Sequence, residues 1–228
     1  MKKPFWAISV VLLLVILAVW SPWKNLDFSI KDLLGLTRPD SFSGLIVYSL
    51  GGNMTVSIDG EIQGEVNLAN SPLEIEGIKA GEHLVELTRE SSLQNAYEKL
   101  SRKMNFEQGV NSILGYELGP TTDFSAGYIF YAASKGNLSG QVSLSITSNP
   151  NAKVLVNGAI AGNSPLQNLT LSVDQKQTIK LEADGYETLE FDIFPDNQTD
   201  RERLKDYNLI IEANLFKVPI NVTEEVSE

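Results

Sequence analysis

The chain has 228 residues, 43 % of them hydrophobic, and a formal net charge of −11 at pH 7. This length suits one large or two small folded domains. The acidity argues against nucleic-acid binding, which needs clustered Lys and Arg to neutralise phosphates. The chain has no cysteine, which excludes disulfides, thiolate metal sites and cysteine nucleophiles.

The N-terminus is typical of an export signal. Met1-Lys2-Lys3 precedes an uncharged apolar run, residues 5–20, and Trp20 and Trp23 suit a membrane interface. No small-x-small cleavage site follows, so we predict that residues 1–23 form an uncleaved transmembrane signal anchor. We predict a cytoplasmic N-terminus, with the bulk of the chain outside the plasma membrane and the lipid bilayer as the partner of this helix.

Two further segments flank the predicted folded region. Residues 24–40 read as a juxtamembrane linker, with a short amphipathic turn at the membrane surface as the alternative. Residues 218–228 form an acidic tail that we expect to be disordered.

The main organising feature is an internal repeat. An ungapped offset of 98 residues carries residues 44–64 onto 142–162, and it matches Ile46 with Leu144 and Tyr48 with Ile146. After a five-residue insertion in the first copy, Ser-Pro-Leu at 71–73 matches Ser-Pro-Leu at 164–166. We therefore predict two tandem modules, at residues 41–120 and 142–217.

Short apolar alternations separated by Gly, Pro and Asn turns indicate antiparallel strands. Asn157-Gly158 and the matching Asp59-Gly60 predict type I′ hairpin turns, which need positive φ at both central residues. Gly64 and Gly162 are expected to end the returning strand, and the prolines of the repeated Ser-Pro-Leu to stand at a strand entrance or sheet edge. The latter are Pro72 and Pro165.

Two segments are less regular. Residues 91–104 favour an enlarged loop leading into a strand, with a short helix as the alternative. Residues 121–141, between the copies, read as a linker or an entry strand, with Lys-Gly-Asn-Leu-Ser-Gly as a flexible joint.

The second copy resembles the PEGA domain family. The family pattern is a strand, a Pro-x-x-Ala turn, Val-x-Val-(Asp/Asn)-Gly, a Gly, a (Thr/Ser)-Pro-Leu and a later Gly-Tyr. The matching positions are Pro150, Ala152, Val154, Val156, Asn157, Gly158, Gly162, Ser164, Pro165, Leu166, Gly185 and Tyr186. The first copy departs from the pattern at Gly52, Met54 and Ala96 and is a divergent relative.

The resemblance implies a small β-sandwich found on surface proteins, without known catalytic residues or cofactors. We expect an all-β fold of two tandem antiparallel β-sandwich modules after one transmembrane helix. The expected function is non-catalytic: structural or adhesive contact in the cell envelope, with envelope polysaccharide or another surface protein as partner. The alternatives are a carbohydrate- or peptidoglycan-binding module and an accessory subunit of a membrane complex.

Few residues suggest chemistry. The single histidine, His83, alternates with Val85 and Leu87 on a predicted strand, and a metal site would need several converging ligands. Asp196, Asn197 and Asp200 lack the spacing of a calcium loop and read as a polar turn. We therefore predict no catalytic, cofactor or metal site.

Three aromatic residues offer a candidate binding surface. Tyr128, Phe130 and Tyr131 would suit sugar stacking or partner docking if they were exposed. The more common role for such residues is in a strand core. Five Asn-x-(Ser/Thr) sequons, beginning at residues 53, 137, 168, 197 and 221, carry little weight in a chain rich in Asn and Thr.

Overall fold

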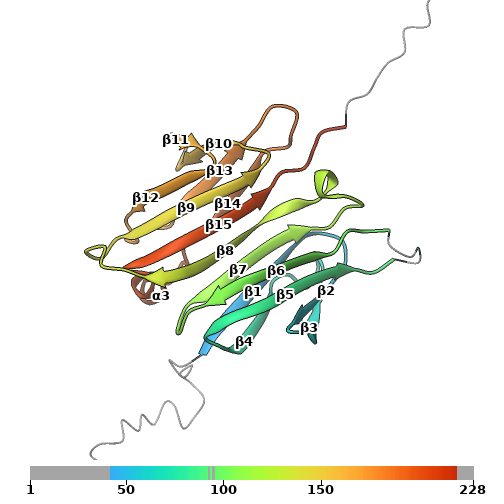
Figure 1. Cartoon of the computed structure of the whole chain (residues 1–228), viewed down its shortest axis with the longest axis horizontal. Coiled ribbons are helices and arrows are strands. Elements are labelled where there is room, and N and C mark those ends of the chain that lie inside the picture. The colour runs from blue at the N-terminus through green and yellow to red at the C-terminus, as the bar shows by residue number, and fades with distance from the viewer. Residues whose placement is uncertain (1–41, 92, 94–95, 220–228) are drawn as a thin grey trace, which may run out of the picture. The chain divides into compact units, whose positions relative to one another are not determined.

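The computed structural model describes residues 42–91, 93 and 96–219, which form three β-sheets, a short α-helix and a 3-10 turn (Figure 1). The predicted anchor at 1–23, the linker at 24–40 and the tail from residue 220 onward lie outside the described residues. Within the described part, no helix has the length and apolar character to span a membrane.

The largest sheet has seven strands in the order β12-β9-β15-β8-β7-β1-β4 (Figure 1). Its strands are β1 Phe42–Gly51, β4 Leu73–Lys79, β7 Asn111–Glu117, β8 Ala126–Lys135, β9 Val142–Asn149, β12 Leu166–Leu171 and β15 Tyr207–Asn214. The pairs β1/β7 and β9/β15 are parallel, and the other pairs are antiparallel. The prediction of purely antiparallel modules was therefore wrong in these two pairs.

Each copy of the repeat adds one four-stranded sheet. The first copy has the order β3-β2-β5-β6 and the second β11-β10-β13-β14. The strands are β2 Met54–Ile58, β3 Glu61–Val66, β5 Gly81–Arg89, β6 Leu100–Phe106, β10 Lys153–Val156, β11 Ala159–Asn163, β13 Thr178–Glu182 and β14 Leu189–Asp192. Each small sheet packs against its own half of the large sheet, which confirms the sandwich-like, mostly β architecture.

Strand β8 joins the two copies. It is hydrogen-bonded to β7 on one side and to β15 on the other. Tyr128 and Phe130 belong to the core of the second copy, whereas Ile129 and Tyr131 pack in the core of the first. Because successive side chains of a strand point to opposite faces, the two cores lie on opposite faces of the large sheet. Residues 121–141, predicted as a linker or entry strand, thus contain the central strand of the sheet.

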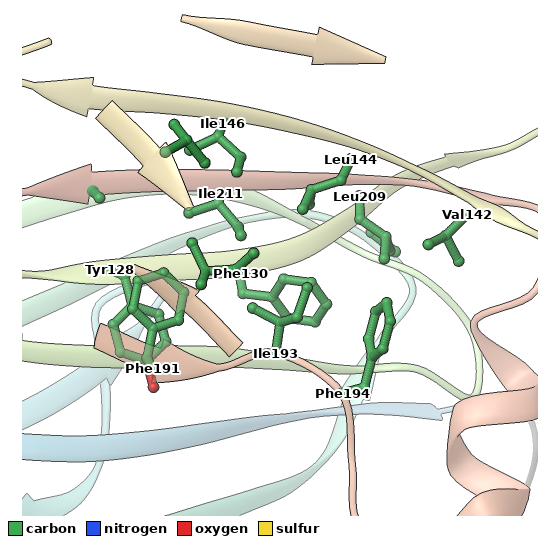
Figure 2. Packing of buried hydrophobic residues seen from close by; sticks show 14 of the residues in the cluster. Tyr128, Phe130, Val142, Leu144, Ile146, Phe191, Ile193, Phe194, Leu209 and Ile211 are labelled. Atoms are coloured by element: carbon green, nitrogen blue, oxygen red, sulfur yellow. The ribbon is translucent and has the colours of Figure 1, made fainter. Parts of the chain in front are cut away.

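The core of the second copy contains a group of aromatic side chains between β8 and the small sheet. Figure 2 shows residues of β9 and β15 directed toward Phe130, Ile193 and Phe194. The rings of Tyr128 and Phe191 stack face to face, with centroids 3.7 Å apart and planes 5° from parallel. This packing ties β8 to the small sheet of the second copy.

Both predicted hairpin turns are confirmed. Asp59 and Gly60 have φ values of 52° and 83°, and Asn157 and Gly158 have 50° and 80°. Gly64 and Gly162, however, lie inside β3 and β11 and do not end them. A Cβ at these glycines would meet Leu73 at 3.2 Å and Leu166 at 3.1 Å. Glycine there makes room for the leucine of the repeated Ser-Pro-Leu.

The two prolines stand where the sequence predicted them. Pro72 directly precedes β4 and Pro165 directly precedes β12. These strands are the two edges of the large sheet. Proline has no N–H to donate. At a sheet edge this costs no ladder hydrogen bond, because no further strand lies there to accept one.

The ungapped alignment is wrong within β1. The core residues there are Leu45 and Val47, whereas Ile46 is half-buried on the other face and Tyr48 is exposed. The hydroxyl of Ser49 donates to the carbonyl of Gly52, and in the second copy Ser148 donates to Pro150. Between these matched residues the first copy thus holds one residue more than the second, which forms a β-bulge between Ser49 and Gly51. A shift of one residue exchanges the two faces of a strand.

The irregular segments take defined structures. Residues 100–106 form β6, as the strand reading predicted, and no helix occurs in the described part of 91–104. The polar turn near Asn197 begins helix α3, Gln198–Arg203, and Asn197 Oδ1 accepts the N–H of Thr199 at 2.8 Å. The predicted joint after β8 is held by Asp206, whose Oδ1 accepts the N–H groups of Leu138 and Gly140 at 2.9 and 3.0 Å.

Candidate functional site

The repeated turn residues bind the neighbouring strand. Asp59 Oδ1 accepts the N–H of Leu84 at 2.9 Å, and Asn157 Oδ1 accepts the N–H of Thr178 at 2.9 Å. The two side chains therefore have the same role, since each joins its hairpin by a hydrogen bond to the neighbouring strand of the small sheet. Asp or Asn suits this position because both tolerate positive φ and carry an acceptor.

His83 also serves the first hairpin. Its Nδ1 lies 2.6 Å from Asp59 Oδ2, and its Nε2 lies 2.9 Å from the carbonyl oxygen of Lys79. The hydrogen bond from His83 lowers the pKa of Asp59 below its ordinary value. Among the described residues, no group of three or more His, Asp or Glu side chains is arranged to hold a metal ion.

The serine of the repeated Ser-Pro-Leu has a role that sequence reasoning missed. Ser164 is buried, and its Oγ accepts the N–H of Ala152 at 2.8 Å and lies 2.5 Å from Ser148 Oγ. Ser71 Oγ accepts the N–H of Ser49 at 3.2 Å in the first copy. The motif therefore joins the edge strand to the end of β1 or β9.

The predicted aromatic surface does not exist as such. Tyr128 is 7 % exposed and Phe130 is 1 % exposed, so both are core residues, and burial raises the pKa of Tyr128 to about 12. Tyr131 is half-buried on the opposite face of β8, and its hydroxyl donates to Glu212 Oε1 at 3.0 Å. Alternation along β8 separates the three side chains, which cannot present one stacking surface.

An open groove of about 530 Å³ lies in the second copy, at the end of its small sheet. It contains two family-motif residues, Pro150 and Tyr186. Its lining residues are Pro150, Asn151, Lys153, Glu182, Ala183, Asp184, Tyr186 and Thr188. The motif residues Ala152, Gly158, Pro165 and Gly185 do not line it.

The charged residues that line the groove are two carboxylates, Glu182 and Asp184, and one ammonium, Lys153. Glu182 pairs with Lys180 at 2.8 Å and with Lys153 at 3.3 Å. Hydrogen bonds from these two ammonium groups lower the pKa of Glu182, and the one from Lys180 has the larger effect. Asp184, by contrast, has no ion-pair partner within the described part of the chain. Asp184 and Tyr186 therefore line the same groove, and the Asp184 carboxylate has no paired cation there.

The first copy has a side chain in the corresponding place. Leu87 pairs with Leu100 as Leu181 pairs with Leu189, so the strand registers match Arg89 to Ala183 and Tyr97 to Tyr186. The Arg89 guanidinium lies 4.2 Å from the centroid of the Tyr97 ring, and its Nη1 donates to the carbonyl of Leu118 at 2.9 Å.

A glycine makes room for this arginine. A Cβ at Gly52 would lie 2.5 Å from the guanidinium carbon of Arg89, and Gly52 matches Pro150 of the groove. A proline in place of Gly52 would therefore clash with this guanidinium, so the first copy combines Gly52 with Arg89 where the second combines Pro150 with Ala183. This explains the departure of the first copy from the family pattern at residue 52.

The fold and these sites define a class of protein: paired β-sandwich modules whose repeated motif residues are structural. The family model of the PEGA domain matches residues 42–122 and 141–204, more than half of the chain, and the chain belongs to this family. The match in two segments confirms two tandem PEGA modules, the first of them divergent. No curated protein matches the chain significantly.

The sequence analysis named Pro150 and Tyr186 but did not combine them with Ala183 or Asp184. The sequence repeat does not give the match of Arg89 to Ala183 directly. The offset at the two Ser-Pro-Leu motifs carries Arg89 onto Glu182, and the offset at the two Tyr-Glu pairs carries it onto Thr178. Only the strand registers set Arg89 against Ala183, so the first copy has a long cationic side chain where the second has a methyl group.

Proposed function

We propose that this protein is a non-catalytic envelope protein that is anchored by residues 1–23 and presents its two PEGA modules as one unit for contact with a partner protein. The observation that carries the proposal is the sharing of β8. Both modules use this strand in their sheet and in their cores. Hydrogen-bonded strands join the modules, where a display protein with independent modules would use a linker.

The residues that could take part in acid–base chemistry support a binding role over catalysis. His83 and Asp59 are engaged with each other and with backbone groups. The groove beside Tyr186 offers a ring face and carboxylates, which suit recognition of a partner. The apolar run at 5–20 and its basic flank support the anchor.

Fractionation of the native host tests the anchor and the orientation. The full chain is expected in the membrane fraction after carbonate washing, and a variant without residues 1–23 is expected to leave it. In cells whose layers outside the plasma membrane have been opened, but whose plasma membrane is intact, added protease should digest residues 42–219. Recovery of the full chain in the soluble fraction, or protection of the modules until the membrane is lysed, would contradict the proposal.

A further inference from the structure

We propose that the groove of the second module binds an arginine side chain of a partner protein. This inference deepens the proposed function by naming the chemistry of the partner. It starts from the first module, where Arg89, at the position that matches Ala183, lies 4.2 Å from the centroid of the Tyr97 ring. The molecule therefore contains an internal example of an arginine on the ring that matches Tyr186.

The walls of the groove suit a guanidinium group. The Tyr186 ring matches the Tyr97 ring on which Arg89 lies, and a planar cation over an aromatic face is attracted by the ring electrons. Two carboxylates and one ammonium line the groove, namely Glu182, Asp184 and Lys153. Since Lys153 and Lys180 already pair with Glu182, Asp184 is the acceptor left for an incoming cation.

Within the described part of the chain, no cation forms an ion pair with Asp184. Lys217 is adjacent in the fold, because it forms an isolated bridge with Tyr186. Its ammonium, however, pairs with Asp123 at 3.2 Å. A cation for Asp184 would therefore come from beyond the described part of the chain. The acidity of the chain, with a net charge of −11, favours a basic partner.

Peptide titration of the purified full chain tests the proposal. The probe is Gly-Gly-Arg-Gly-Gly, and the matched control replaces its arginine with citrulline, which keeps the shape and removes the charge. Amide shifts of Ala183, Asp184 and Thr188 in the ¹⁵N-labelled protein are expected to saturate with the arginine peptide, at an affinity about fivefold or more above the citrulline peptide. Equal affinity for the two peptides, or no shifts at these amides, would overturn the proposal.

Variants taken from the first module sharpen the test. Pro150→Gly with Ala183→Arg copies the arrangement of Gly52 and Arg89, and it should abolish binding by filling the groove from within. Pro150→Gly alone is the control and should still bind. Arg89→Ala should open a matching groove in the first module and raise the number of bound peptides from one to two. Undiminished binding by the double variant would count against the site.

A carbohydrate probe separates the alternative ligand. A trisaccharide of N-acetylglucosamine is added to the same labelled protein. If the sugar shifts the groove amides and competes the arginine peptide away at lower concentration, the groove is a sugar site and the proposal fails. These titrations use purified protein, so they are independent of the membrane fractionation. The groove proposal can therefore fail while the proposed function stands, and the reverse is also possible.

Discussion

The ring of Tyr128 covers Gly115 on the paired strand, so that a Cβ on Gly115 would lie 2.7 Å from Tyr128 Cε1. The neighbouring pair repeats the arrangement in reverse. A Cβ on Gly127 would lie 2.3 Å from Cδ2 of Tyr116. Each tyrosine thus lies over the glycine opposite it, one on each face of the sheet, where β8 meets the first module.

Gly115→Ala is expected to destabilise the protein, since the added methyl group cannot fit under the Tyr128 ring. Tyr128 cannot move away freely, because its other face stacks on Phe191. Overpacking of this kind costs about 1–3 kcal/mol in the free energy of unfolding. Urea denaturation of the full chain measures it. Gly136→Ala is the control, because a Cβ there has no neighbour closer than 3.7 Å. Equal midpoints for the two variants would contradict the packing argument.

Asp59 should make the first module sensitive to acid. The hydrogen bond from His83 lowers the pKa of Asp59 in the folded state. A carboxyl whose pKa is lowered by folding stabilises the protein above its unfolded pKa of about 3.9, and this contribution is lost as the pH falls through the folded value. The free energy of unfolding is therefore expected to drop between pH 5 and the lower folded pKa.

The second module supplies the matched variant for this acid effect. Asp59→Asn gives the first hairpin the residue that the second has at Asn157, so the acceptor for the Leu84 N–H is kept. The variant should lose part of the pH dependence between about pH 5 and 3, as measured by urea denaturation at each pH. If the variant and the parent chain show the same slope, Asp59 does not contribute.

Local features of the fold were predictable from the sequence. The turns at Asp59-Gly60 and Asn157-Gly158 follow from the φ preferences of adjacent residues. The edge positions of Pro72 and Pro165 follow from the missing N–H of proline. Each of these depends on a few consecutive residues, so no knowledge of distant pairing was required.

The shared strand was harder to predict because its partners are distant in the chain. Tyr131 of β8 pairs with Ile210 of β15, about eighty residues away, and no local pattern specifies this choice. The apolar run at residues 128–132 nevertheless lacks polar alternation. Such a run is typical of a strand that is buried on both faces. The groove was hidden for another reason, because its lining residues lie far apart in the chain and include the small side chain of Ala183.

Gly52 and Arg89 are expected to be energetically coupled. A methyl group at Gly52, where φ is 76°, meets the guanidinium of Arg89 and strains the backbone. Gly52→Ala should cost about 1–2 kcal/mol or more in the parent chain. In an Arg89→Ala background the steric part disappears, so the second cost should be smaller by about 0.5 kcal/mol or more. Thermal and urea denaturation of the four proteins measure the coupling; strict additivity would show that the two positions do not touch.

The shared strand makes a final prediction about fragments. The second module without β8, residues 141–219, lacks Tyr128, Phe130 and Ala132, which are part of its core. Loss of one buried aromatic side chain costs about 3–5 kcal/mol, against a total stability of about 5–15 kcal/mol for a domain. This fragment is therefore expected to unfold or to expose its core, whereas residues 124–219 should fold cooperatively.

The same comparison applies to the first module. Residues 42–122 lack Ile129 and Tyr131, and the extension to residue 135 restores them. Near-ultraviolet circular dichroism and the dispersion of amide signals distinguish folded from collapsed fragments. Because β8 serves both cores, each module should require it, and both extended fragments contain it. Native-like dispersion and cooperative melting of residues 141–219 alone would show that the modules are independent.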